Sequence, residues 1–492
     1  MPLLSVNPVD GSLIREYAEA SPEQVVEMLA AAARAFEAWR RSSFAERSLA
    51  LNGAGALLRE RRDELARLMA LEMGKPLAQG RAEADKCAAA CDYYAQNAER
   101  LLAPEPAASD AWKSYVAFEP LGVVLAVMPW NFPLWQVFRF AAPALAAGNV
   151  GLLKHASNVS GCALAIEEIL HAAGVPRDAF RTVLVGSGRV AALVEAREVA
   201  AVTLTGSGPA GRAVAARAGA SLKKTLLELG GSDPYIVLED ADLEHAAETC
   251  AASRLVNGGQ SCIAAKRFVV VEPVRKEFEE RLVARMRARR MGDPLTEGID
   301  VGPQARRELR DAVHAQVEAS IARGARVLLG CAIPAGPGAF YPPSVLSDVR
   351  SGMPAFDEEL FGPVAAVIAA KDEAEAIRLA NGSAFGLGAA VFTRDLERGE
   401  RIARYELAAG SCFVNSLVKS DPRLPFGGIK QSGYGRELAA FGLREFVNVK
   451  TVSVAAVAGV ARPPDGPSAR PDAGVKQAPG AGVARPPGAK SA

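Results

Sequence analysis

The run Val123-Val124-Leu125-Ala126-Val127-Met128 decides the fold of this 492-residue chain. An unbroken apolar run of this kind is typical of a parallel strand that is buried on both faces. Similar runs follow at 150–154, 182–185 and 201–205, and helical patterns near 134–147, 159–172 and 209–218 separate them. Strands that alternate with helices in this way predict a doubly wound α/β sheet that binds a nucleotide.

Helical patterns occupy most of the chain before this sheet. Ser21 is expected to cap the first helix, with Pro22 at the first helical position and Gln24 completing a capping box. A second amphipathic pattern covers 45–73, and we expect it to break near Gly53.

A glycine motif follows the fourth of these strands. Residues 206–211 read Gly-Ser-Gly-Pro-Ala-Gly, which matches the G-x-G-x-x-G pattern between a strand and a helix. Glu228 follows 17 residues after Gly211, near the position where such a motif places an acid that binds a ribose. This motif alone therefore favours a cofactor role for Glu228.

A second glycine-rich stretch leads into a cysteine, as Asn257-Gly258-Gly259-Gln260-Ser261-Cys262. Glycines allow positive φ and a close approach to the backbone, so the Cys262 thiol could face a cavity. A thiolate adds readily to an electrophilic carbonyl, and a few per cent of a free thiol is ionised near neutral pH. The alternative is that Cys262 is a small buried apolar residue.

Four further motifs accompany this cysteine. They are Pro-Trp-Asn-Phe-Pro at 129–133, Glu-Leu-Gly-Gly at 228–231, Glu-Leu-Phe-Gly-Pro at 359–363, and Pro-Phe-Gly-Gly at 425–428 with Ser-Gly-Tyr-Gly-Arg-Glu at 432–437. In this order the chain resembles the aldehyde dehydrogenase superfamily, from about residue 5 to about 455. The resemblance implies an α/β fold with a Rossmann-type dinucleotide-binding domain, an α/β catalytic domain and a β-strand oligomerisation arm.

The resemblance also divides the chain into domains. It implies a dinucleotide-binding domain at 1–101 and 121–230, a catalytic domain at 231–430 and an arm at 102–120 and 431–456. Residues 457–492 are rich in Pro, Gly and Ala, and this composition predicts a disordered tail.

The catalytic roles that the resemblance implies belong to Cys262, Glu228 and Asn131. Cys262 would form a thiohemiacetal and then a thioester, and Asn131 would stabilise the oxyanion together with the backbone N–H of Cys262. Glu228 would activate water, which favours hydrolysis over transfer to coenzyme A and replaces the ribose-binding interpretation. Glu437 matches a second family glutamate that could relay protons.

The cofactor residues follow from the same motifs. The implied contacts are Trp130, Asn131, Lys154, His155, Ala156, Ser157, Gly206, Ser207, Leu229, Glu359 and Phe361. Ser157 stands where NAD-selective relatives often carry a glutamate that binds both ribose hydroxyls. A serine leaves room for a 2′-phosphate, which Lys154 could neutralise, so NADP or NAD is the expected cofactor.

The resemblance also implies the substrate residues, because the helix after Pro133 lines the family's substrate tunnel. The set comprises Arg139, Phe132, Trp135, Gln136 and Ser420. Members that oxidise succinate semialdehyde carry Arg at position 139, where a guanidinium could bind a distal carboxylate at the tunnel mouth. Some of them have a second Arg six residues before the cysteine, where this chain has Val256, and Lys419 or Ser420 could supply that contact. Succinate semialdehyde is the expected substrate, and glutarate semialdehyde or another carboxylated or aliphatic semialdehyde is the alternative.

Composition limits the remaining possibilities. With 57 basic and 56 acidic residues, nothing suggests a nucleic-acid or membrane partner, and the protein is expected to be cytoplasmic. The resemblance implies a homodimer or homotetramer. The seven scattered cysteines predict neither a disulfide framework nor a metal site. A cysteine hydrolase is disfavoured because the four histidines lie in no Cys–His motif.

Overall fold

Two largely parallel sheets organise the first of the two units into which the chain divides. The structure, a computed structural model, describes residues 2–459. The first unit comprises the chain up to Leu102 together with Glu119–Asn448, and the second comprises Ala103–Phe118 with the chain from Val449 onward. All the predicted catalytic, cofactor and substrate residues therefore belong to the first unit.

The first sheet contains the apolar runs that the sequence predicts. Its order is β19-β9-β8-β5-β6-β7, and all pairs are parallel except β19 with β9. The strands are β5 (Val123–Met128), β6 (Val150–His155), β7 (Phe180–Thr182), β8 (Val199–Thr205), β9 (Lys224–Glu228) and β19 (Gly433–Tyr434). The expected mostly parallel sheet of apolar strands is confirmed.

One strand prediction is wrong in position. The run at 182–185 is not a strand, because β7 ends at Thr182. Val183 still donates its N–H to Leu153 O at 2.8 Å, but the carbonyl of Leu184 accepts from Ala20 N instead of continuing the ladder. Val183 and Val185 are apolar because they are buried, although the strand pairing with β6 ends at Thr182.

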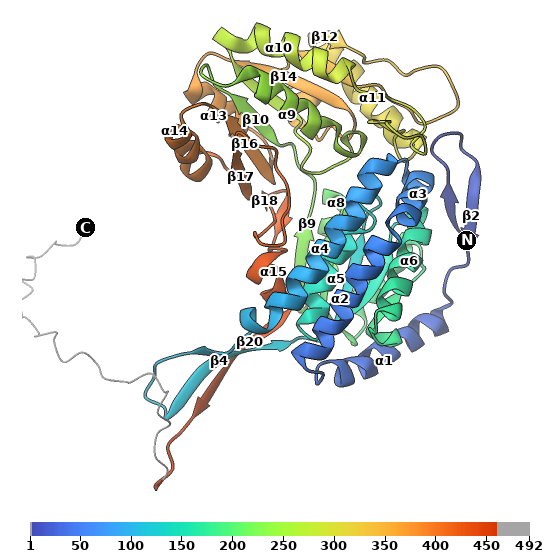
Figure 1. The fold of residues 1–492 in the computed structure, drawn as a ribbon, viewed down its shortest axis with the longest axis vertical. Helices are drawn as coiled ribbons and strands as arrows, with labels where there is room; N and C mark the ends of the chain where they lie inside the picture. The colour runs from blue at the N-terminus through green and yellow to red at the C-terminus, as the bar shows by residue number, and fades with distance from the viewer. Residues whose placement is uncertain (1, 460–492) are drawn as a thin grey trace, which may run out of the picture. The chain divides into compact units, whose positions relative to one another are not determined.

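Helices cover this sheet, and α2, α4 and α5 lie side by side (Figure 1). The helices of this part are α1 (Pro22–Trp39), α2 (Phe44–Glu60), α3 (Arg62–Met73), α4 (Leu77–Leu101), α5 (Trp135–Ala146), α6 (Ser160–Ala172), α7 (Val190–Glu195) and α8 (Gly208–Ala220). The predicted capping box of α1 is present, with Ser21 Oγ accepting from Gln24 N at 3.2 Å and Gln24 Oε1 from Ser21 N at 2.8 Å.

The break expected near Gly53 lies elsewhere. The pattern over 45–73 divides at Arg61, whose backbone (φ −90°, ψ 11°) leaves the helical region. Gly53 continues α2, and a Cβ there would lie 3.3 Å from Cβ of Ala173. The glycine therefore allows close packing rather than a kink.

The second sheet has the order β12-β13-β14-β11-β10-β16-β17, with only β12 antiparallel to its neighbour. Its strands are β10 (Pro234–Val237), β11 (Arg267–Val271), β12 (Arg326–Leu329), β13 (Ser344–Ser347), β14 (Val364–Ala370), β16 (Gly388–Phe392) and β17 (Ser411–Val414). The accompanying helices are α9 (Leu243–Leu255), α10 (Glu272–Arg287), α11 (Arg307–Ala322), α12 (Pro354–Asp357), α13 (Glu373–Asn381) and α14 (Leu396–Arg401). A short pair, β15 (Phe385–Gly386) with β18 (Ile429–Lys430), and the hairpin β1 (Leu3–Val6) with β2 (Leu13–Tyr17) complete the strands of this unit.

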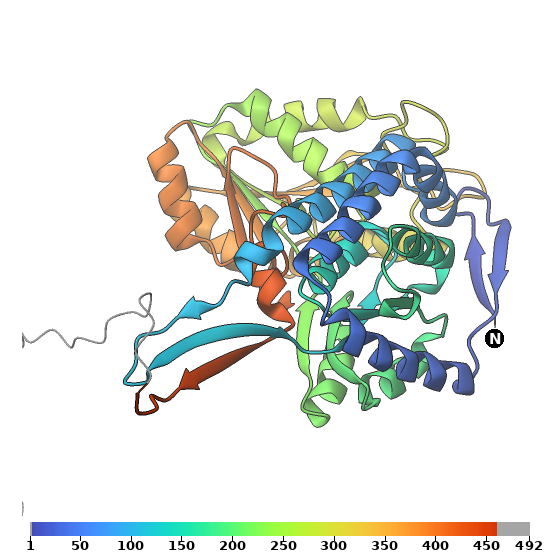
Figure 2. The same ribbon diagram turned by 60° about the horizontal axis from the view of Figure 1, so that its bottom comes forward.

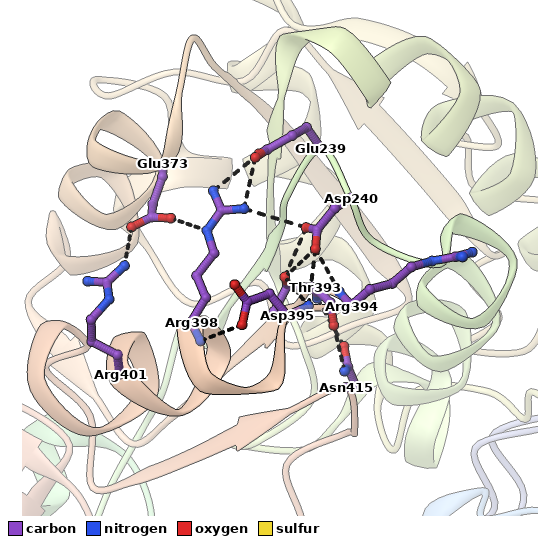
Figure 3. Close-up of polar contacts among 9 residues, drawn as sticks. All are labelled: Glu239, Asp240, Glu373, Thr393, Arg394, Asp395, Arg398, Arg401 and Asn415. Carbon is purple, nitrogen blue, oxygen red and sulfur yellow. Dashed lines mark hydrogen bonds and ion pairs between the residues drawn. The ribbon is translucent and has the colours of Figure 1, made fainter.

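A polar network joins the loops after β10 and β16 (Figure 3). Asp240 accepts hydrogen bonds from Thr393 Oγ1 at 2.8 Å and from the backbone N–H of Arg394 at 2.9 Å. Arg398 bridges Glu239 at 2.8 Å and Glu373 at 2.5 Å. These contacts join the two loops that follow the carboxyl ends of the neighbouring strands β10 and β16.

The second unit is built on three strands. Its sheet has the order β20-β4-β3, from β3 (Glu105–Pro106), β4 (Lys113–Pro120) and β20 (Val447–Val454), as Figure 2 shows. Residues 431–446, which the sequence assigns to the arm, contain β19 and α15 (Ala439–Glu445) and belong to the first unit. The tail predicted for 457–492 lies, from residue 460, outside the described residues. Within residues 2–459, no helix is long and apolar enough to cross a membrane.

Candidate active site

Cys262 follows a turn that only small or specially placed residues can form. Asn257, Gly258 and Gly259 have φ of 53°, 61° and 78°. A Cβ at Gly259 would collide with the backbone of Gly362, so a side chain could not be accommodated there. The glycine turn that the sequence predicts is confirmed, and Cys262 is only partly exposed at its end.

The thiol faces an inner cavity of about 390 Å³. The cavity is lined by Pro129, Trp130, Asn131, Gln136, Thr205, Gly206, Ser207, Leu229, Gly230, Cys262, Arg306, Leu309, Glu359 and Phe361. Burial raises the pKa of Cys262 to about 12, although Arg139 and Lys266 oppose this shift. The resting group is therefore a thiol, with far less thiolate than the few per cent expected of a free cysteine, and it needs a base.

Asn131 is held beside this thiol by a chain of amides. Its Nδ2 donates to Gln260 O at 3.0 Å, and its Oδ1 accepts from Gln136 Nε2 at 3.0 Å. Its backbone O accepts from Asn257 Nδ2 at 2.6 Å and Lys75 Nζ at 2.9 Å. Since one N–H of Nδ2 is used on Gln260, the other can still serve a ligand.

Glu228 is the last residue of β9 and is 2% exposed. Neither of its carboxyl oxygens has a hydrogen-bond partner within residues 2–459. Burial raises its pKa most, Arg139 opposes the shift, and the nearby charge of Glu437 adds to it. A carboxyl group with a raised pKa is suited to accept a proton near neutral pH.

Arg139 does not lie at a tunnel mouth, and that part of the prediction is wrong. Its side chain is 3% exposed and forms an ion pair with Glu437, which is equally buried. Its Nη2 donates to Thr205 Oγ1 at 3.2 Å, and its guanidinium carbon lies 4.9 Å from the ring centroid of Phe426. The buried carboxylate of Glu437, distant in sequence, attracts the guanidinium inward.

An outer cavity of about 380 Å³ lies beside the same segment of chain. It is lined by Gln79, Ala82, Glu83, Lys86, Phe132, Trp135, Ala252, Leu255, Val256, Arg289 and Asp300. Phe132 and Trp135 line this cavity, whereas Gln136 lines the inner one. Residues of the segment 130–136 thus line two different cavities.

Ser420 adjoins the outer cavity through two hydrogen bonds. Its Oγ accepts from Trp135 Nε1 at 3.1 Å and from Lys86 Nζ at 2.7 Å. Lys86, on α4, was missed by the sequence reasoning. The one feature of the sequence that points to Lys86 is its place between Glu83 and Cys87, two residues on the buried face of α4.

The inner cavity also contains most of the predicted cofactor residues. Gly206 and Ser207 lie at the N-terminus of α8, where Ser207 caps the helix. A Cβ at Gly211 would lie 2.6 Å from Cδ2 of Leu229, so glycine allows α8 to pack closely here. Trp130 and Phe361 meet edge to face at 5.9 Å.

Glu359 lines the same cavity and is held by Gly231 N at 3.0 Å and Lys266 Nζ at 3.6 Å. A helix N-terminus, two aromatic walls and an anchored carboxylate together fit a dinucleotide.

Four predicted cofactor residues lie at the carboxyl end of β6, outside the inner cavity lining. Burial lowers the pKa of Lys154, and the charge of Glu19 opposes this shift. His155 Nε2 lies 2.9 Å from Pro133 O, and burial lowers its pKa to about 4, so this ring is neutral and structural. Ala156 follows, and Ser157 begins a 3₁₀ turn that ends at Val159.

Comparisons with known proteins agree with this geometry. Residues 2–452 match the aldehyde dehydrogenase family. A probable NADP(+) succinate-semialdehyde dehydrogenase of Synechocystis sp. is 49% identical over 455 residues, covering 92% of this chain and 100% of the relative. The NADP(+) succinate-semialdehyde dehydrogenase 1 of Mycobacterium tuberculosis is 50% identical over 460 residues, with coverage of 92% and 100%.

A solved structure adds the same relationship. The succinic semialdehyde dehydrogenase of Streptococcus pyogenes, in complex with NADP+, has a TM-score of 0.90 and 33% identity, covering 92% of this chain and 100% of that one. The motifs, the turn that carries Cys262 and these matches lead to one conclusion. This chain belongs to the aldehyde dehydrogenase family.

Proposed function

We propose that this aldehyde dehydrogenase oxidises succinate semialdehyde to succinate, with NADP or NAD as the hydride acceptor. The observation that carries the proposal is that Cys262, Asn131 and the N-terminus of α8 line the same cavity. The names of relatives at about half identity supply the substrate. Glutarate semialdehyde and other carboxylated or aliphatic semialdehydes are the alternative.

The first step forms a bond from Cys262 Sγ to the aldehyde carbon. Because the thiol is protonated at rest, its proton must leave first, and Glu228 is the buried base proposed to take it. The carbonyl oxygen becomes an oxyanion, which Asn131 Nδ2 and the Cys262 backbone N–H would stabilise.

When bound, the nicotinamide cofactor would supply the acceptor for the hydride that leaves the tetrahedral carbon. Trp130, Phe361 and Glu359 would position it, and Lys154, Ala156 and Ser157 would hold the adenosine ribose side. Ser157 leaves space for a 2′-phosphate that Lys154 can neutralise.

Hydrolysis of the thioester completes the cycle. Glu228 would deprotonate a water that attacks the acyl carbon, and the departing sulfur would recover a proton as Cys262. One aldehyde, one water and one oxidised cofactor thus give one acid, one reduced cofactor and one proton. Glu437 would accept protons from Glu228 through their shared buried site, and Arg139 would balance the charge of that pair.

The wider assignments remain part of the proposal. Residues 1–101 and 121–230 would bind the dinucleotide, and 231–430 would form the catalytic domain. Residues 102–120 with the chain from β20 to 456 would pair subunits into a homodimer or homotetramer. The aldehyde would be a cytoplasmic small molecule.

The test is an absorbance assay of reduced cofactor. Purified protein is mixed with NADP or NAD and a panel containing succinate semialdehyde, glutarate semialdehyde and butanal. The highest kcat/KM is expected with succinate semialdehyde, and activity with NADP is expected. Equal kcat/KM for butanal would contradict the proposed substrate without contradicting the family.

A further inference from the structure

Lys86 is a cation in the wall of the outer cavity that has no carboxylate partner within the described chain. It lies on α4 and is partly buried. Its Nζ lies 4.2 Å from the ring centroid of Trp135 and donates to Ser420 Oγ at 2.7 Å. Among residues 2–459, no Asp or Glu oxygen lies within ion-pair distance of it.

The two acidic side chains whose charges raise the pKa of Lys86, Glu83 and Asp421, have other partners. Glu83 pairs with Lys75 and accepts from the backbone N–H of Leu134 and Trp135 at 2.9 Å each. Asp421 binds Arg423 at 2.6 Å. Lys86 is therefore a desolvated charge with an incomplete set of partners.

The electrostatics agree with this description. Burial and, to a smaller extent, the charge of Arg139 lower the pKa of Lys86 to about 8. An anion beside Nζ would offset both the cost of burying the ammonium and its repulsion from Arg139. These unfavourable effects are expected of a site that binds an anionic ligand, because a structural ion pair would already offset them.

Ser420 adds a donor at the same place. Its Oγ already accepts from Lys86 and from Trp135 Nε1, which occupies both lone pairs of the hydroxyl. Its own O–H must therefore point to another acceptor. An ammonium with two unused N–H groups and an adjacent O–H form a complementary pair for the two oxygens of a carboxylate.

We infer that Lys86, together with Ser420, binds the distal carboxylate of the substrate and thereby selects semialdehydes that carry an acid group. This inference rests on the proposed function and adds the residue that binds the distal carboxylate. Arg139 is already paired with Glu437, and Val256 contributes no charge to this cavity.

The experiment compares Lys86→Met, Lys86→Arg and wild type on succinate semialdehyde and butanal. Methionine keeps an unbranched chain against Trp135 and removes the charge. Lys86→Met is expected to lose about 10- to 100-fold in kcat/KM with succinate semialdehyde, mainly through KM, and less than about threefold with butanal. Lys86→Arg should recover most of the loss.

Lys371→Met is the matched control, because Lys371 is exposed and lines neither cavity. It should leave both substrates within about twofold of wild type. Thermal unfolding and NADP titration by protein fluorescence confirm that each variant is folded and binds cofactor.

The outcomes separate the two proposals. If wild type does not prefer succinate semialdehyde over butanal, the proposed substrate fails. If wild type has that preference and Lys86→Met keeps it, or loses both substrates equally, the assignment of Lys86 is overturned.

Discussion

Arg139 and Glu437 form an ion pair in which each side chain is 3% exposed. Glu228 is the third charged group of this buried set, since the charges of both partners shift its pKa. The ion pair therefore influences the pKa of Glu228, the proposed base, and also contributes to the packing of the buried site.

Replacing Arg139 should damage this set rather than substrate selection alone. Arg139→Leu leaves the Glu437 carboxylate buried without its partner, and we expect a loss of about 3–5 kcal/mol in the free energy of unfolding. Urea denaturation of the variant, and of the double variant Arg139→Leu with Glu437→Leu, measures the effect. The double variant should recover a large part of the loss. A loss of activity confined to succinate semialdehyde would instead return Arg139 to the substrate's carboxylate.

Cys262 should be slow to alkylate in the free enzyme. Because burial raises its pKa to about 12, the thiolate fraction should grow about tenfold per pH unit up to at least pH 9. The rate of inactivation by iodoacetamide in the absence of cofactor measures this fraction. A rate that levels off by pH 8 would show that the thiol is much more acidic than its buried position implies.

Removing the thiol should abolish the reaction and spare the cofactor site. Cys262→Ala should show no dehydrogenation above background, while NADP still quenches protein fluorescence. Turnover near that of wild type would contradict the proposed nucleophile.

Glu228 should matter most for the second half of the cycle. In Glu228→Gln we expect one rapid turnover of hydride at high pH, where hydroxide helps to deprotonate the thiol, followed by a stalled thioester. Rapid-mixing absorbance of the reduced cofactor would show a burst close to one equivalent per site. No burst at any pH would show that Glu228 is already required for hydride transfer, which would contradict this prediction.

Ser157 should influence the choice of cofactor. A carboxylate at this position would repel a 2′-phosphate and could bind a 2′-hydroxyl, so Ser157→Glu should lower kcat/KM for NADP by about tenfold or more relative to NAD. The measurement is the ratio of kcat/KM with NADP to kcat/KM with NAD. Ser160→Glu is not a suitable control, because Ser160 is buried and donates a hydrogen bond to Ser157 O. An unchanged ratio would mean that position 157 does not face the ribose.

Asp240 should stabilise the loops of Figure 3 in a pH-dependent manner. Although burial works against it, hydrogen bonds from Thr393 and the backbone of Asp395 and Arg394 hold its pKa below the ordinary value. Its contribution is therefore present above the unfolded pKa of about 4 and is lost as pH falls through the folded value. Asp240→Asn should cost about 1–3 kcal/mol at pH 7 and less near pH 3, as measured by urea denaturation. An equal cost at both pH values would exclude this linkage.

Local sequence determined much of this molecule. The apolar runs became β5, β6 and β8, because a strand buried on both faces needs no polar alternation. The glycine turn before Cys262 was also predictable, since positive φ and a close backbone approach depend on only a few adjacent residues.

Tertiary structure decided how the charged side chains are used. Arg139 was expected at a tunnel mouth, but its partner Glu437 comes from a distant segment, and no local pattern reports such a pair. Lys86 on α4 likewise contacts Ser420 and Trp135, which reach it only in the folded chain. Long side chains can follow several directions from one backbone position, so the charges packed around them select the direction.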